Sequence, residues 1–185
     1  TNRELMTLHV QALFTHDAQS RLLRVNEPGG GGLAPRFFLG RTQEGNLWRF
    51  RADLSETLIT KLEALCMDEP IVRDLHNKPR HCEEYMRLLE PHTPLQNLWQ
   101  GPAYRFTEYL EPSRPVVAIT KTNADLLRGG FEELIPELPN WQPFLAVVEN
   151  GQAVSICRSV RITPEAHEAG VETLRDFRGK GYAKD

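Results

Sequence analysis

The chain has 185 residues, of which 40% are hydrophobic and 25% are charged, and its formal net charge at pH 7 is −3. That length suffices for one or two domains, and the hydrophobic fraction is compatible with a packed core. The slightly acidic balance argues against a general nucleic-acid binder, which carries a surplus of basic residues. No apolar run approaches the roughly 20 residues that span a bilayer, so neither nucleic acid nor membrane is an expected partner.

The cysteine pattern indicates a reducing environment. Cys66, Cys82 and Cys157 are odd in number, far apart in the sequence and without a C-x-x-C pair. A disulfide framework is therefore not expected, and the cytosol fits best. The first residues also lack the basic-then-apolar pattern of a secretory signal. We expect a cytoplasmic protein.

The first fifty residues predict one helix and two hairpins. A short helix is expected over 3–12, and two strand-like segments flank a turn at 18–20. Two more flank the glycine-containing turn at 43–46, which predicts a second hairpin. Between the hairpins, residues 27–32 contain a proline and four glycines and predict a loop. No Gly-Lys-Ser/Thr follows these glycines, so the loop is not a nucleotide-binding P-loop.

Two helices and an irregular segment are expected next. Ser55 can cap a helix that runs to about Met67, and a second helix is expected between Pro79 and Pro91. Residues 91–115 contain five prolines and a glycine and predict an irregular connection. We place the domain boundary near its end, which gives an N-terminal α+β domain at 1–112 and a second domain at 113–185.

The second domain predicts strands with two short helices after the first of them. Thr122 or Asn123 is expected to cap the first of these helices. Asn150-Gly151 is the strongest short hairpin signal in the chain and joins two strands. The expected strands are 115–120, 144–149, 152–162 and 167–174, and the second short helix covers 131–139.

A glycine-containing segment follows the last strand, at Arg178-Gly179-Lys180-Gly181-Tyr182-Ala183. Glycines in such a place let backbone N–H groups approach a ligand closely. A ligand that takes several backbone donors is commonly a phosphate. The alternative is a flexible basic tail.

Residues 115–185 resemble the first half of a GNAT N-acetyltransferase. That superfamily carries Arg/Gln-x-x-Gly-x-Gly/Ala between its fourth strand and third helix, and the segment from Arg178 to Ala183 matches each fixed position. The longer string from Ala153 to Ala183 is similar to an uncharacterised bacterial subgroup. The resemblance implies an α+β/α/β fold, with a mixed, mostly antiparallel sheet and flanking helices. A small antiparallel-sheet plus helix domain of unknown role precedes it.

The resemblance also implies acetyl-CoA as co-substrate and no metal. Its pyrophosphate would lie on the glycine segment and its pantetheine along the last strand. The implied cofactor-binding residues are Val171, Thr173, Leu174, Arg178, Gly179, Lys180, Gly181, Tyr182 and Ala183.

Two carboxylates are candidates for the general base that deprotonates the attacking amine. Glu168 and Glu172 lie at even spacing on one strand, so both are expected on the same face, with His167 on the opposite face. Glu168 lies nearer the place where several family members keep a base, whereas Glu172 lies nearer the expected acetyl group. Cys157 could suggest a covalent acetyl-enzyme, but a lone cysteine in an apolar strand is more often a core residue.

The sequence ends where the third helix of the family should begin. The tyrosine that serves as general acid in this family would lie beyond that point, and Tyr182 is not its counterpart. The resemblance therefore implies the first half of an acyltransferase core, active as the full-length protein and inactive as this fragment. The last strand would also have an unpaired edge, which invites association, and a homodimer is one outcome.

Several alternatives remain open. The acceptor could be a small-molecule or a peptide amine, and the chain could instead be a non-catalytic acyl-CoA-binding or protein-interaction module. Trp48, Trp99 and Tyr104 could line an acceptor pocket, although each residue type is more often core packing. One cluster could be drawn as a metal site but lacks any standard zinc spacing; it comprises His76, His81, Cys82 and Glu83.

Overall fold

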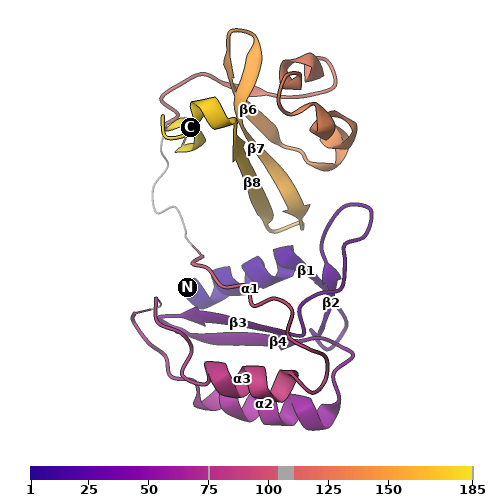
Figure 1. Ribbon diagram of the computed structural model, residues 1–185, viewed down its shortest axis with the longest axis vertical. Helices are drawn as coiled ribbons and strands as arrows, with labels where there is room; N and C mark the ends of the chain where they lie inside the picture. The colour runs from indigo at the N-terminus through magenta and orange to yellow at the C-terminus, as the bar shows by residue number, and fades with distance from the viewer. Residues whose placement is uncertain (75, 104–110, 185) are drawn as a thin grey trace. The chain divides into compact units, whose positions relative to one another are not determined.

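The computed structural model describes residues 1–74, 76–103 and 111–184 (Figure 1). The chain divides into two compact units: Thr1–Asn26 with Gly30–Arg105, and Glu27–Gly29 with Phe106–Asp185. All named strands pair antiparallel, and helices accompany them in both units. The expected mixed fold with antiparallel sheets is therefore confirmed. No helix in the described ranges is long and apolar enough to cross a membrane.

The first unit has the helices and hairpins that the sequence predicts. Its helices are α1 (Asn2–Leu13), α2 (Glu56–Asp68) and α3 (Cys82–Leu89). Its hairpins are β1 (Phe14–His16) with β2 (Leu22–Val25), and β3 (Phe37–Thr42) with β4 (Gly45–Phe50). The Ser55 side chain accepts a hydrogen bond from the Leu58 N–H and caps α2, as expected.

The hairpin of β3 and β4 lies between α1 and the pair α2–α3 (Figure 1). Alternation along β4 turns Leu47 toward the core beneath α1 and Phe50 toward the core beneath α2 and α3. Trp48 is partly buried and packs against that second core. Trp99 is 85% exposed, and Tyr104 lies outside the described residues.

A buried carboxylate joins α2 to α3. Glu69 follows α2, is 4% exposed, and accepts hydrogen bonds from the N–H groups of Arg80 and His81, at 2.6 and 3.1 Å. The Tyr85 hydroxyl also lies 3.3 Å from this carboxylate. The N-cap residue of α3, His81, makes no side-chain cap of its own. Glu69 therefore satisfies the backbone N–H groups of the N-cap residue and of the residue before it, and so fixes the start of α3.

The core beside this carboxylate makes the first unit sensitive to alkali. Burial raises the pKa of the Cys66 thiol to about 12, whereas an unfolded chain releases that proton near pH 8.5. The folded state thus keeps a proton that the unfolded state loses. We expect the free energy of unfolding to fall as pH rises from about 8.5 toward 12, by at most about 1.4 kcal/mol per pH unit from this thiol.

Denaturant titrations at successive pH values between 8 and 10 measure this slope. Cys66→Ala should flatten it, while Cys82→Ala, at a partly exposed thiol, should leave it unchanged. Tyr85, whose pKa burial also raises, adds to the slope at higher pH in every variant. An unchanged slope in Cys66→Ala would contradict the assignment.

The second unit contains a four-stranded antiparallel sheet in the order β5-β6-β7-β8. Its strands are β5 (Val116–Ala118), β6 (Phe144–Glu149), β7 (Gln152–Ile162) and β8 (His167–Thr173). The Asn150-Gly151 turn joins β6 to β7 as predicted, with φ of 51° and 80°, values that a type I′ hairpin requires.

The short helices of this unit are 3-10 helices. They are η1 (Ala124–Leu127), η2 (Glu132–Asn140), η3 (Arg175–Phe177) and η4 (Tyr182–Lys184). Pro136 and Pro139 remove backbone donors inside η2, which explains why it does not become an α-helix. Asn123, one of the two expected cap residues, is the N-cap residue of η1, but its side chain makes no capping hydrogen bond. Its side chain instead accepts from the Thr120 N–H at 2.7 Å and donates to the Ala118 carbonyl at 2.9 Å.

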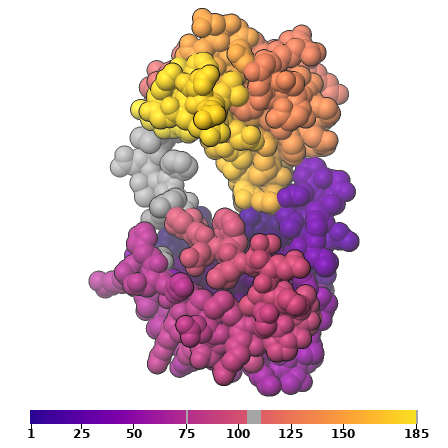
Figure 2. Space-filling model, viewed as in Figure 1, coloured from indigo at the N-terminus to yellow at the C-terminus, as the bar shows by residue number. Residues whose placement is uncertain are grey.

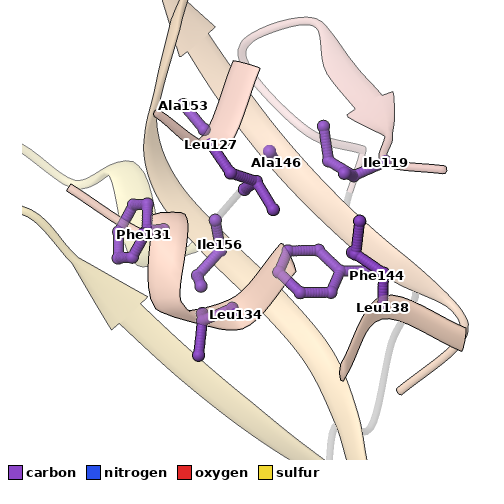
Figure 3. Packing of buried hydrophobic residues seen from close by; sticks show 9 residues of the cluster. All are labelled: Ile119, Leu127, Phe131, Leu134, Leu138, Phe144, Ala146, Ala153 and Ile156. Carbon is purple, nitrogen blue, oxygen red and sulfur yellow. The ribbon is translucent and has the colours of Figure 1, made fainter. Parts of the chain in front are cut away.

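The core of the second unit lies between the sheet and η1 and η2 (Figure 3). Leu127, Leu134 and Leu138 point from the two 3-10 helices toward Phe144 and Ile156 on the sheet. Figure 1 shows these helices on one side of the sheet and the C-terminal turns on the other. The large core cluster of this unit thus lies on the face of the sheet that η1 and η2 cover.

Phe144 is fully buried in this core, whereas its neighbour Leu145 points to the other face and is 38% exposed. We expect Phe144→Ala to lower the free energy of unfolding by about 3–5 kcal/mol, because it removes a large buried ring and leaves a cavity. Leu145→Ala is the matched control and should cost less than about 1 kcal/mol. Denaturant titration of both variants tests the prediction, and equal losses would contradict it.

Candidate functional site

Among the described strands, β8 forms one edge of the sheet and pairs with β7 alone. Just beyond it, the Leu174 N–H donates to the Val154 carbonyl on β7 at 2.9 Å. Backbone groups of an antiparallel strand point alternately toward and away from the partner strand. The backbone groups of Glu172 and Gly170 therefore point toward β7, as those of Leu174 do. The backbone groups of Val171 and Thr173 point away from β7, out from the edge of the sheet.

Both backbone groups of Leu174 are already hydrogen-bonded, so only its side chain is available to a ligand at this edge. Its N–H is bound to Val154, and its carbonyl accepts from the Phe177 N–H at 2.9 Å. The side chain lies against Gly130, where a Cβ atom would come within 2.5 Å of Leu174 Cδ2. The glycine thus allows the link between η1 and η2 to approach the end of β8.

A hollow of about 510 Å³ lies at this edge. It is bounded by the η1–η2 link, the end of β8 and the C-terminal turns, through Gly130, Phe131, residues 171–175, Arg178 and Ala183. Five of the residues that the resemblance assigns to the cofactor line it: Val171, Thr173, Leu174, Arg178 and Ala183. Two arginines and one glutamate also give its lining a positive balance.

The glycine segment forms an exposed turn beside the hollow. Gly179 and Gly181 have φ of 72° and 79°, in the left-handed region that favours glycine. Among the described residues, none accepts a hydrogen bond from the N–H groups of Gly179, Lys180 or Gly181. Successive free N–H groups in a turn can form a concave anion-binding nest, which makes these three groups candidates for such a site. Residues 175–184 lie on the surface of their unit in Figure 2, so the turn is accessible to a ligand.

Aromatic and basic side chains fix the turn to the sheet. The Tyr182 hydroxyl donates to Glu149 on β6 at 3.2 Å, and the Arg114 guanidinium lies 4.3 Å from the centre of its ring. Arg114 also donates to the Lys180 carbonyl at 3.2 Å. The Lys180 ammonium lies 5.2 Å from the centre of the Phe177 ring. Tyr182 is therefore an anchor of the turn.

Arg178 joins the turn to the end of β8. Its Nε donates to the outward-pointing carbonyl of Thr173 at 2.9 Å. The Thr173 hydroxyl lies 2.8 Å from Ser155 Oγ on the neighbouring strand. The outward backbone groups that remain for a ligand at this end of β8 are therefore those of Val171 and the Thr173 N–H.

Both candidate bases are paired with arginines of β7. Glu172 Oε1 lies 2.6 Å from Arg158 Nη1, and Glu168 pairs with Arg161. The two arginines are an odd number of positions apart along their strand, and the two glutamates are an even number apart. They can pair because the register of β7 shifts between Ser159 and Arg161, which turns both arginines to the same face. Of the two glutamates, only Glu172 lines the hollow.

Arg158 and Trp141 do not line the hollow, but Arg158 adjoins it through its ion pair with Glu172, and neither residue was identified from the sequence. The guanidinium lies 4.7 Å from the centre of the Trp141 ring. Arg158 interrupts the apolar strand sequence AVSICRS, and a charged residue among core residues was the available signal. Its partner could not be read from the sequence, because the pairing depends on the strand register.

The remaining candidates from the sequence are two histidines and a cysteine, whose neighbours the structure shows. His167 Nδ1 lies 3.0 Å from Ser159 Oγ. Burial raises the pKa of the Cys157 thiol, which disfavours the thiolate that a covalent mechanism needs. His81 Nε2 lies 2.8 Å from Asp68 Oδ2. Within the described ranges, no three His, Cys, Asp or Glu side chains gather as metal ligands would.

The chain matches no protein-family model, and neither the curated proteins nor the solved structures contain a match to it. The function is therefore inferred from the residues and geometry described above.

Proposed function

We propose that the second unit is the first half of an acetyl-CoA-dependent N-acetyltransferase core, and that the full-length protein transfers an acetyl group to an amine. The observation that carries this proposal is the turn at 179–181. It presents unpaired N–H groups beside a positively balanced hollow at the edge of a sheet. The strand and helix order and the match at Arg178–Ala183 support the same interpretation.

In this proposal, the pyrophosphate of acetyl-CoA binds the nest at Gly179, Lys180 and Gly181. The pantetheine arm lies along the edge of β8 and pairs with the outward backbone groups of Val171 and Thr173. Leu174 and Phe131 provide apolar walls beside it. The Arg178 guanidinium uses its Nε to hold the end of β8, and its other N–H groups remain near the phosphates.

The reaction is direct attack of the acceptor amine on the thioester carbonyl. Glu172 is the better-placed base, because it lines the hollow while Glu168 does not. Glu172 must leave or share Arg158 to accept a proton. No described residue is assigned as the general acid for the leaving thiolate.

A second candidate is a non-catalytic acyl-CoA-binding module. The pairing of both Glu168 and Glu172 with arginines favours it, because each carboxylate already contacts a guanidinium and would have to leave it to reach an amine. The phosphate nest and the edge of β8 would serve this function without any base.

The phosphate assignment predicts that Gly181→Glu in the full-length protein weakens CoA binding by at least about a hundredfold, or about 2.7 kcal/mol. The substitution places a negative charge beside the nest and a side chain at a φ of 79°. Gly151→Glu is the matched control, because it puts the same residue at a similar φ, in the turn between β6 and β7. Calorimetric titration with CoA measures both. Equal affinities in two folded variants would refute the assignment.

The catalytic assignment predicts that Glu172→Gln lowers turnover by about 10²–10⁴-fold, the usual contribution of a general base, while CoA affinity is retained. Glu168→Gln is the comparison variant and should have the smaller effect. Release of CoA thiol from acetyl-CoA over a panel of amines provides the rate. CoA binding without any turnover in the unmodified protein would favour the non-catalytic module.

A further inference from the structure

We propose that the acceptor of this site is an amine that also carries a carboxylate, and that Arg158 binds that carboxylate. This inference rests on the proposed function and names its substrate class. It begins from the surroundings of Arg158, which the proposed reaction has not used except as the partner of Glu172.

The Arg158 side chain is only 11% exposed, and the Trp141 ring lies beside its guanidinium. One acceptor is present, Glu172 Oε1, at 2.6 Å from Nη1. The Nε atom is buried and has no hydrogen-bond partner, and no acceptor for Nη2 occurs among the described residues. The guanidinium therefore has more donors than acceptors, which is unfavourable for a largely buried charge.

Glu172 and Arg158 constrain each other. The Arg158 side chain is 11% exposed whereas that of Glu172 is 47% exposed, so the costly change is removal of the carboxylate, which leaves the largely buried arginine charge uncompensated. Glu172 can therefore turn toward an incoming amine only when another anion takes its place beside Arg158. A carboxylate on the acceptor supplies that anion and matches the planar donor arrangement of a guanidinium.

The positive balance of the hollow agrees with an anionic group on the acceptor. Arg175 and Arg178 line it along with Glu172, so an acceptor that presents only a cationic amine gains nothing from these arginines. An amine with a carboxylate close by provides one group for Arg158 and another for Glu172. Free amino acids, and peptides or small molecules with that pair of groups, belong to this class.

The reaction balances with acetyl-CoA as the second reactant. The amine nitrogen forms a bond to the thioester carbonyl carbon, and the bond from that carbon to sulfur breaks. The bonding electron pair leaves with the sulfur. The proton lost by the nitrogen passes to Glu172. Glu172 is free to accept it because the acceptor carboxylate has replaced it beside Arg158.

Glycine and glycinamide form the matched probe pair, because they differ in the carboxylate alone. We would titrate each into the 185-residue chain at constant ionic strength and follow the indole N–H signal of Trp141 by two-dimensional NMR. Trp141→Phe assigns that signal among the three tryptophans. Glycine should shift the signal saturably and glycinamide should not. Equal responses, or no response to either probe, would overturn the proposal.

Two variants test the role of Arg158. Arg158→Gln should abolish the glycine response, while Arg21→Gln, which removes an Arg–Glu pair in the first unit, should retain it. Glu172→Gln should tighten glycine binding about tenfold, since it removes the anion that competes for Arg158. If Arg158→Gln does not fold, Glu172→Gln decides alone, and unchanged or weaker glycine binding would then overturn the proposal.

A parallel CoA titration separates this inference from the proposed function. The phosphate nest does not involve Arg158, so Arg158→Gln should leave CoA affinity unchanged. If the protein binds glycine but not glycinamide, and the full-length protein does not bind CoA, the carboxylate site is supported and the acetyltransferase function is refuted. If the full-length protein binds CoA and acetylates glycine and glycinamide at equal rates, the acetyltransferase function is supported and the carboxylate requirement is refuted.

Discussion

The hydrogen bond from the Leu174 N–H to the Val154 carbonyl determines the geometry of the candidate site. It is the last bond between the β7 and β8 segments, and it sets which backbone groups of β8 point outward. It also places the Leu174 side chain against Gly130 and the core. From that fixed point the chain turns through η3, so the position of the glycine turn depends on it as well. The outward groups of β8, the Leu174 side chain in the hollow and the position of the glycine turn therefore all depend on this one hydrogen bond.

The register shift in β7 has a comparable effect on the charged groups. Val160 is the extra residue, and its Cγ1 atom lies 2.5 Å from where a Cβ of Gly170 would be. Without this shift, Arg158 and Arg161 would point to opposite faces. With it, each arginine pairs with a glutamate on the same face of β8. A glycine on one strand and an extra residue on the other thus produce two cross-strand ion pairs.

Local signals in the sequence predicted most of the fold. Asn150-Gly151 predicted its hairpin because few other residue pairs adopt positive φ at both positions, and Ser55 predicted the start of α2. The 3-10 form of η1 and η2 was not predicted. Pro136 and Pro139 were an available signal for η2, whereas η1 contains no proline and its helix type depends on tertiary packing. Asn123 shows the same limit: its side chain satisfies groups of the preceding turn, which no residue pattern specifies.

The site was less predictable than the fold, because its chemistry depends on partners from different strands. The sequence placed Glu168 and Glu172 on one strand, and could not show that each has an arginine beside it. That pairing changes what the carboxylates can do, since a base must be free when the amine arrives. A catalytic site built on Glu172 thus needs an event that separates it from Arg158, and a binding module needs none. Because the two functions make opposite demands on the same ion pair, Arg158 is the residue that distinguishes them.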